Sequence, residues 1–321
     1  AVTSIFSGST LYGIYKAIVE MKDLNEKTHG LEAISIVDTI PEIHPDNTDR
    51  NRTSPFAFTG NRFEFRAVGS GANCACAMIV LNTAVAEALT DFRQRVDARL
   101  AKGENKISII LDELRRDIKA CAPIRFEGNG YSKEWRDEAR LRGLDCETST
   151  PVSYDRYLDD SSVRMFETMN VMHRSELQAR NEIKWETYWK KIQIEGRVLG
   201  DLCMNHIIPV ATRYQSELAD NVMKIQSTFP AERAKSLSAY NITLIEQIND
   251  HTSFIVQAVT DMTEKRKVAN RLTDPRAKAI AYHDTVAPRL EEIRHHIDDL
   301  ELIIEDELWP LPKYRELMFT R

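Results

Sequence analysis

The chain has 321 residues, of which 42% are hydrophobic, so it is long enough to bury one large core or two ordinary ones. Its formal net charge is −6 and its isoelectric point is near 5.8. A surface that binds nucleic acid needs a basic face that releases phosphate counterions. The composition therefore argues against a DNA or RNA partner.

No apolar run in the sequence approaches the ~20 residues that cross a bilayer. The first residues, Ala1 to Gly8, lack the basic region and apolar core of a signal peptide. We therefore expect a cytoplasmic protein without a membrane partner. The chain opens without Met in the apolar stretch from Ala1 to Phe6, which indicates a cut through a larger protein.

The cysteines are odd in number and show no repeated C-x-x-C spacing, which predicts neither a disulfide framework nor a zinc site. Reduced, partly buried thiols are the ordinary interpretation of such residues. The five are Cys74, Cys76, Cys121, Cys146 and Cys203.

Residues 1 to about 80 carry most of the turn signals and the β-type patterning, including Ile34 to Val37 and Pro41 to Pro45. We expect this portion to mix strands and helices. From about Ala77 the pattern becomes helical, because apolar residues recur at intervals of three and four. These residues are Met78, Leu81, Val85, Leu89 and Phe92.

A second helix is predicted from Ile107 to Ala120, ended by Pro123. The glycines around Asn129 favour turns, so Phe126 to Tyr131 is predicted to be a loop. Ser132 offers an N-cap for a further helix that runs through Trp135 to about Leu141, with Gly143 as its stop.

The last part of the chain, which begins at Pro151, is predicted to be almost wholly helical. Its charges are interspersed through long periodic segments, which is typical of a bundle or of long hairpins. The expected helices span about 161–172, 175–194, 197–226, 230–269 and 274–308.

Two features of the last helix invite a functional interpretation. His295 and His296 lie among acidic residues, but neighbours on a helix point about 100° apart, which favours a solvated acidic face over a metal cluster. The leucine and isoleucine stripe from Leu290 to Leu308 is too short to establish a coiled coil. Core packing and a subunit contact explain this stripe equally well.

Chemistry is concentrated around a short predicted strand. Arg62, Glu64 and Arg66 alternate with Phe63 and Phe65, which is the two-residue period of a half-buried strand. One face of the strand is therefore polar and the other aromatic. We expect the two phenylalanines to anchor it in a core, where each contributes ~1.5–3 kcal/mol.

The polar face of this strand suits a metal-bound phosphoryl group. A carboxylate oxygen is a hard ligand for Mg²⁺ or Mn²⁺, and a guanidinium fork matches a phosphate or a carboxylate. An exposed ladder of ion pairs with little energetic weight is the alternative. Arg50 and Arg52 lie just upstream, and Gly60 permits the chain to return toward them. Four arginines around one carboxylate favour an anionic ligand, but the pattern alone leaves both interpretations open.

The run from Asp49 to Arg66 resembles the type III branch of the glutamine synthetases. Asn51 to Ser54 is similar to the Asn-Arg-Ser element of that family, and Arg62 to Arg66 is similar to its Arg-x-Glu-x-Arg strand. Gly71 to Cys74 resembles the Ala-Asn segment that follows. The resemblance spans nearly the whole chain, since it extends to residues 126–131, 191–197, 205–209 and 308–315.

The resemblance implies an α+β fold. Residues 1–125 would form the C-terminal part of the glutamine synthetase catalytic domain, an antiparallel sheet with helices, and residues 126–321 a mostly helical extension. By position, Glu64 would be a ligand of a catalytic divalent metal. Arg62 would contact the phosphates of the nucleotide or the acyl phosphate. Arg52 and Arg66 would hold the glutamate carboxylate and the phosphoryl group in transfer, and Arg52 would also take part in binding the nucleotide.

The resemblance also implies a ligase that uses ATP with Mg²⁺ or Mn²⁺. ATP phosphorylates the γ-carboxylate of glutamate, and ammonia then displaces phosphate from γ-glutamyl phosphate to give glutamine. Members of the family assemble as homo-oligomers, in stacked hexameric rings. Their other metal ligands and their N-terminal domain would lie upstream of Ala1, so we expect this chain alone to be inactive.

Two alternative functions stay open at the level of sequence. A γ-glutamyl-amine ligase of the same fold would keep Arg62, Glu64 and Arg66 and would differ only in the pocket for the nucleophile. A helical assembly or regulatory protein with a degenerate site is the alternative from another class. The presence of Arg52 together with Arg62, Glu64 and Arg66 counts against degeneracy.

Overall fold

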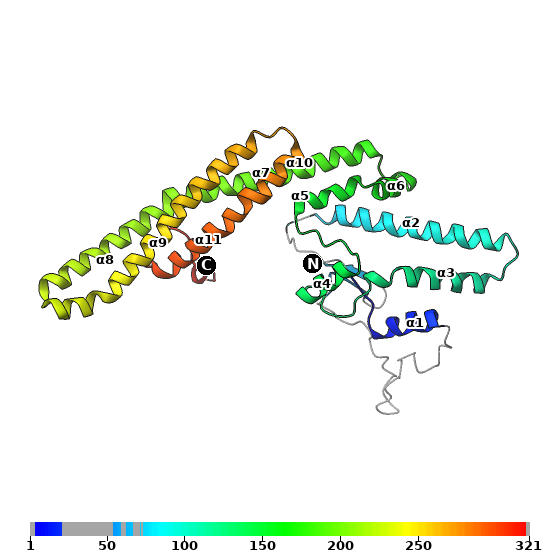
Figure 1. Ribbon diagram of the computed structural model, residues 1–321, viewed down its shortest axis with the longest axis horizontal. Helices are drawn as coiled ribbons and strands as arrows, with labels where there is room; N and C mark the ends of the chain where they lie inside the picture. Colours follow the sequence, from blue (N-terminus) through cyan, green and yellow to red (C-terminus); the bar gives the residue numbers. More distant parts are fainter. Residues whose placement is uncertain (1–3, 21–53, 59–61, 67–70, 72, 319–321) are drawn as a thin grey trace, which may run out of the picture. The chain divides into compact units, whose positions relative to one another are not determined.

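A computed structural model describes residues 4–20, 54–58, 62–66, 71 and 73–318 (Figure 1). The chain divides into two compact units. Unit 1 comprises Ala1–Thr148 with Arg164–Met172, and unit 2 comprises Ser149–Val163 with His173–Arg321. Helices dominate the described residues and a small sheet accompanies them, so the α+β prediction is confirmed. The expected β-type segments at 34–37 and 41–45 lie outside the described residues.

The strands of the described residues form one three-stranded sheet in unit 1. Strand β1 (Ile5–Phe6) pairs in parallel with β2 (Phe56–Phe58), and β2 pairs antiparallel with β3 (Phe63–Phe65). The register places Phe6, Ala57 and Glu64 in one row across the sheet. Ala57, at the centre of the row, is fully buried.

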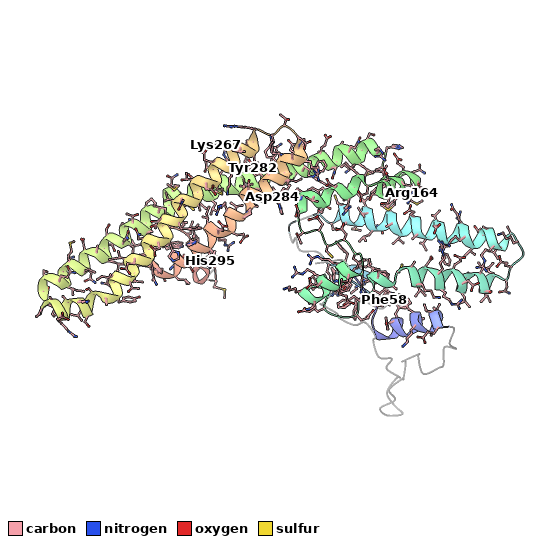
Figure 2. The ribbon with its side chains drawn as sticks, in the orientation of Figure 1. Phe58, Arg164, Lys267, Tyr282, Asp284 and His295 are labelled. Atoms are coloured by element: carbon pink, nitrogen blue, oxygen red, sulfur yellow. The ribbon has the colours of Figure 1, made fainter. Side chains whose placement is uncertain are left out.

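The phenylalanines of β2 and β3 gather on one face of this sheet. The Phe63 ring stacks on Phe56 at 5.1 Å between centroids and contacts Phe58 at 5.2 Å, and Figure 2 labels Phe58. Phe63 and Phe65 are each 44% exposed, so the expectation that they lie in a core is wrong for the described part of the chain. Their anchoring comes instead from ring contacts across the strands with Phe56 and Phe58 of β2.

Helix α1 (Ser9–Glu20) lies against α3 (Lys106–Ala120), which forms a hairpin with α2 (Ala75–Leu100). Arg115 Nε of α3 donates to the carbonyl oxygen of Ile18, near the end of α1. Asn105 caps α3, because its side-chain oxygen accepts from the backbone N–H groups of Ile107 and Ser108. Both predicted helices are present, and α2 extends to Leu100.

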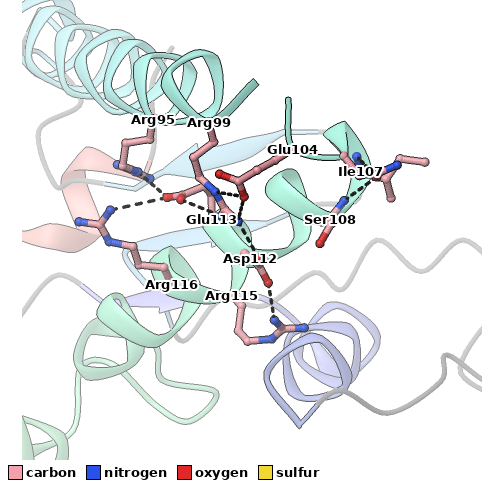
Figure 3. A network of polar contacts seen from close by, with 10 residues as sticks. Arg95, Arg99, Glu104, Ile107, Ser108, Asp112, Glu113, Arg115 and Arg116 are labelled. Atoms are coloured by element: carbon pink, nitrogen blue, oxygen red, sulfur yellow. Dashed lines mark hydrogen bonds and ion pairs between the residues drawn. The ribbon is translucent and has the colours of Figure 1, made fainter. Parts of the chain in front are cut away.

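A network of charged side chains joins α2 to α3 (Figure 3). The carboxylate of Glu113 is largely buried and lies 2.7 Å from Arg95 Nε and 3.4 Å from Arg99 Nη1. Arg116 approaches the same carboxylate at 3.6 Å. Because two hydrogen bonds and a further ion pair compensate one largely buried charge, this network can stabilise the hairpin.

Helix α2 is long enough and apolar enough to cross a membrane, by length and composition alone. An 18-residue window within it has a mean hydropathy of 1.4, and 6% of that window is buried. The expectation that no segment approaches this criterion is therefore corrected. One such helix is weak support for a membrane span, since the core helix of a globular protein passes the same test.

The predicted helix after Ser132 is confirmed as α4 (Lys133–Leu141). The hydroxyl of Ser132 accepts the backbone N–H of Trp135 at 3.1 Å, and Gly143 has φ of +76°, as a glycine stop requires. Trp135 is fully buried and stacks on Phe126, with 4.0 Å between ring centroids. This stack fixes the loop before α4 onto the helix.

The part of the chain after residue 148 is helical, as predicted. Helices α8 and α9 run side by side as a long hairpin in unit 2, and α11 lies along α9 (Figure 1). The described elements are α5 (Thr150–Ser153), η3 (Tyr154–Leu158), α6 (Asp160–Thr168), α7 (Arg174–Leu202), η4 (Cys203–Ile207), α8 (Ile208–Thr228), α9 (Ala231–Asn270), α10 (Pro275–Ala281), η5 (Tyr282–Val286), α11 (Ala287–Ile303) and α12 (Tyr314–Leu317).

The expected break between residues 194 and 197 is absent, because α7 continues through Gly196. A Cβ atom at Gly196 would lie 3.6 Å from Met262 Sδ and 3.8 Å from Val286 Cγ1. These are ordinary van der Waals distances, so the packing against α9 and η5 does not require a glycine here, and Gly196 does not end the helix. The last expected helix, 274–308, ends instead at Ile303.

Two prolines lie inside nearly continuous helices of unit 2. The π-helical segments η4 and η5 come directly before Ile208-Pro209 and Ala287-Pro288. In each, the residue before proline donates its N–H to a carbonyl five residues back. A proline ring clashes with the carbonyl four residues back, and the wider π turn relieves this clash.

A triangle of polar side chains joins three helical segments of unit 2. Tyr282 of η5, which is labelled in Figure 2, is fully buried. Its hydroxyl donates to Asn270 Oδ1 at 2.7 Å. Gln193 Nε2 donates to both Tyr282 Oη and Asn270 Oδ1, at 3.0 and 2.8 Å. Burial raises the pKa of the Tyr282 hydroxyl, so it remains a proton donor.

The last long helix packs through its apolar stripe and through one histidine. Ile293, Ile297 and Leu300 are buried in the core of unit 2, so core packing accounts for these residues of the stripe, whereas Leu302 is 86% exposed. His296 Nδ1 lies 2.9 Å from His251 Nδ1 of α9, and its ring stacks on Phe254. The expected solvated face therefore holds for the exposed His295 but not for His296.

All five cysteines are free. Cys203 is buried, and burial raises the pKa of its thiol to about 11. Cys74, Cys76 and Cys121 are exposed, so the expectation of partial burial is wrong for these three.

We expect Glu113→Gln to destabilise the α2–α3 hairpin. The hydrogen bond and the charge of Arg95 hold the pKa of Glu113 below its ordinary value of 4.5. The hydrogen bond from Arg99 and the charge of Arg116 act in the same direction. This stabilisation is present above the unfolded-state pKa and is lost as pH falls through the folded-state value. Urea denaturation should show a loss of about 1–2 kcal/mol at pH 7 and a smaller difference at pH 3. An exposed control, Glu134→Gln, should show neither effect.

Unit 2 should lose stability as pH falls below about 6.5, the unfolded-state pKa of histidine. Burial and the neighbouring His251 and His295 lower the pKa of His296, although Asp299 and Glu292 oppose this. The unfolded chain then binds more protons than the folded one, so stability rises with pH across this window. His296→Phe, which can keep a ring against Phe254, should flatten the dependence of the thermal midpoint on pH. An equal slope in His296→Phe and His295→Gln would contradict this assignment.

Candidate functional site

Arg62, Glu64 and Arg66 lie together at β3, as their alternation predicts. Glu64 Oε1 is 3.5 Å from Arg62 Nη2, and Glu64 Oε2 is 3.0 Å from Arg66 Nη2. The pairing of Ala57 with Glu64 fixes the carboxylate on the side of the sheet opposite the phenylalanines. A backbone hydrogen bond from Arg66 N to the Pro55 carbonyl, at 2.8 Å, continues the pairing beyond the strand.

The two guanidinium groups keep the carboxylate ionised. The hydrogen bond from Arg66, followed by the charges of Arg66 and Arg62, holds the pKa of Glu64 below its usual range. The Glu64 side chain is 37% exposed and Arg66 is 26% exposed. A ligand can therefore reach the carboxylate from solvent, while Arg66 is held more firmly than Arg62.

One nitrogen of Arg66 distinguishes this cluster from an ordinary surface ladder. Its Nη1 is buried and has no hydrogen-bond partner within the described part of the chain. A buried charged donor without an acceptor is costly, because it has lost its water without compensation. An oxygen of a phosphate or carboxylate ligand would supply the missing acceptor, and a guanidinium binds such groups well.

The described residues do not form a metal site by themselves. Among them, no group of three or more His, Cys, Asp or Glu side chains is arranged to hold a metal ion. Glu64 offers one carboxylate, and both of its oxygens already accept from arginines. Arg50, Arg52 and Gly60 lie outside the described residues, so the expected approach of the upstream arginine pair stays a prediction.

Two residues that support the site were missed in the sequence. Ser54 is fully buried, and its hydroxyl lies 3.0 Å from the Phe56 carbonyl and 3.4 Å from that of Ser4, which ties β2 to β1. Glu127, in the predicted loop, binds the turn after β1. Local pattern could not reveal the contacts of Ser54 with Ser4 or of Glu127 with this turn, because the partners are far apart in the chain.

A family model described as the glutamine synthetase C-terminal domain matches residues 109–226. This match begins in α3 and ends in α8.

Three relatives align along the whole of this chain. A glutamine synthetase of Bacteroides fragilis is 47% identical over 324 residues, a type-3 glutamine synthetase of Dictyostelium discoideum is 32% identical, and a glutamine synthetase of Butyrivibrio fibrisolvens is 26% identical. The alignments cover 44%, 43% and 44% of these relatives, so the chain spans less than half of their length. This chain is thus similar along its whole length to a part of these glutamine synthetases, and residues 109–226 match the model of their C-terminal domain.

Proposed function

We propose that this chain supplies part of the active site of an enzyme that joins ammonia to the γ-carboxylate of glutamate at the expense of ATP. The observation that carries the proposal is the buried, unpartnered Nη1 of Arg66 beside the ionised Glu64. The names of the three relatives support the same reaction.

The arginines suit the charge changes of this reaction. In the first step the γ-carboxylate oxygen attacks the γ-phosphorus of ATP, which gives γ-glutamyl phosphate and ADP. Ammonia then attacks the acyl carbon, a proton is lost, and phosphate leaves. Such steps depend on positioning and on neutralising oxygens, which guanidinium groups do without a covalent nucleophile. Arg66 would hold the carboxylate or the phosphoryl oxygens, and Arg62 would contact the phosphates.

Two further assignments extend this site. Arg52 keeps its proposed role in holding glutamate and nucleotide phosphate. Glu64 would give one oxygen ligand to Mg²⁺ or Mn²⁺, and the metal, when bound, would neutralise phosphate oxygens. The remaining ligands would come from outside this chain, which supports the expectation that the chain alone is inactive.

We also propose membership of the type III branch, with residues 1–125 as part of the catalytic domain and 126–321 as the helical extension. The run from Asp49 to Arg66 and the alignment with the type-3 enzyme of Dictyostelium discoideum support the branch. On the same grounds we expect a cytoplasmic homo-oligomer of stacked hexameric rings.

The first test is phosphate release by the full-length protein, dependent on ATP, glutamate and ammonia. We expect Glu64→Ala to lower kcat by about 10²–10³, the usual loss when one preorganised electrostatic group is removed. Glu134→Ala, an exposed residue of α4, should leave the rate unchanged. Full activity in Glu64→Ala would refute the site. Release that requires a polyamine in place of ammonia would identify a γ-glutamyl-amine ligase instead.

Arg66→Lys should be nearly as damaging as Arg66→Ala. Lysine keeps the positive charge but loses the planar fork that can hold Glu64 and a ligand oxygen together. We expect kcat/KM for glutamate to fall at least about tenfold, in keeping with the loss of one charged hydrogen bond. The matched control is Arg93→Lys on the exposed side of α2. Near-normal activity in Arg66→Lys would show that charge alone suffices.

A further inference from the structure

The carboxylate of Glu127 binds two consecutive backbone amides far away in the chain. Its Oε1 accepts from Ser7 N at 3.0 Å, and its Oε2 accepts from Gly8 N at 2.9 Å. Gly8 has φ of +80°, which glycine adopts without strain. Successive amides next to such a residue form a concave site for an anion. Here the anion is a side chain of the protein itself.

This contact lies where strand β1 passes into helix α1. Tyr12 N donates to the Gly8 carbonyl at 3.0 Å, which is the first hydrogen bond of the helix. Glu127 therefore faces the N-terminus of α1, where the helix dipole favours a negative charge. At the other end, Arg115 binds the Ile18 carbonyl, so α1 is held at both ends by groups of suitable sign.

The loop that carries Glu127 is itself firmly placed. Phe126 N donates to the Ile5 carbonyl at 3.1 Å, and the Phe126 ring stacks on the buried Trp135. A Cβ atom at Gly128 would lie 2.6 Å from Phe126 Cζ, so the loop closes tightly over that ring. Glu127 thus reaches the β1–α1 turn from a support that is anchored to α4.

The turn is one residue away from the row of the sheet that contains Glu64. Ser7 follows Phe6, and the register aligns Phe6, Ala57 and Glu64. Strand β1 has only two residues, and strands this short depend on neighbouring contacts for their position. Strand β3 lies two strand spacings of about 4.8 Å from β1. Because β2 is hydrogen-bonded to both strands, a shift of β1 would be transmitted through β2 to β3.

We infer that Glu127 is a positioning residue for the face formed by Arg62, Glu64 and Arg66. It holds β1, and through β2 it sets where β3 presents its carboxylate and guanidinium groups. This inference rests on the proposed function, because that function gives the face its ligand.

The test uses the full-length protein and a non-hydrolysable ATP analogue with an imido β–γ bridge. Glu127→Gln keeps the shape of the side chain but turns an NH₂ group toward one of the two amides. We expect the Kd of the analogue, measured by calorimetry, to rise three- to tenfold, which is roughly the loss of one charge-assisted hydrogen bond. The kcat of the reaction with ATP should also fall. Glu134→Gln should change neither. Glu127→Asp keeps the charge but not the reach, and it should resemble Glu127→Gln.

A double-mutant cycle separates positioning from a general loss of stability. If Glu127 acts through Arg66, adding Glu127→Gln to Arg66→Lys should raise the Kd less than about twofold further, because coupled residues are not additive. Full multiplication of the two effects would overturn the inference. So would a lower thermal midpoint with an unchanged Kd. An unchanged Kd in Arg66→Lys would contradict the proposed function. If the Kd changes in Arg66→Lys but stays the same in Glu127→Gln and Glu127→Asp, only this inference is contradicted.

Discussion

Backbone pairing of three very short strands is the interaction on which the candidate site depends. Alternation along β3 separates Arg62, Glu64 and Arg66 from the phenylalanines only while β3 stays in register with β2. A slip of one residue would turn the carboxylate to the aromatic side. Contacts outside the strands oppose such a slip. They are the backbone hydrogen bond from Arg66 to Pro55, the hydrogen bond from the Ser54 hydroxyl to the Ser4 carbonyl, and the binding of the β1–α1 turn by the Glu127 carboxylate.

Polar and charged groups of the candidate site are less completely hydrogen-bonded than those of the structural networks elsewhere in the described residues. Glu113 is surrounded by arginines, and Tyr282 closes a triangle of hydrogen bonds, so each of these groups is compensated by the protein. Arg66 is only partly compensated, because Glu64 takes one nitrogen and the buried Nη1 has no acceptor among the described residues. An anionic ligand would remove this desolvation penalty on binding, because its oxygen would accept a hydrogen bond from Nη1. The contrast separates a structural ion-pair network from a surface prepared for phosphate or carboxylate.

In unit 2, residues that often end a helix, such as glycine and proline, lie within long helices. Gly196 lies within α7 and does not interrupt it, and it packs beside Met262 and Val286. Pro209 and Pro288 follow π-helical turns that widen the helix and allow it to continue. His296 similarly leaves the expected solvated face to contact His251 and Phe254. In each case a neighbouring helix, or the geometry of the turn, outweighs the local preference.

The sequence by itself determined the local features of this protein. Periodicity placed α3, α4 and the α8–α9 hairpin, because apolar spacing and caps act within a few residues. Alternation put Arg62, Glu64 and Arg66 on one face, and the resemblance of Asp49 to Arg66 led to the family. Only the tertiary structure decided that Phe63 and Phe65 stack half exposed, that Glu127 supports β1, and that Arg66 keeps a buried donor unpaired. Burial and hydrogen-bond completion depend on groups that lie far apart in the chain, and no local pattern records them.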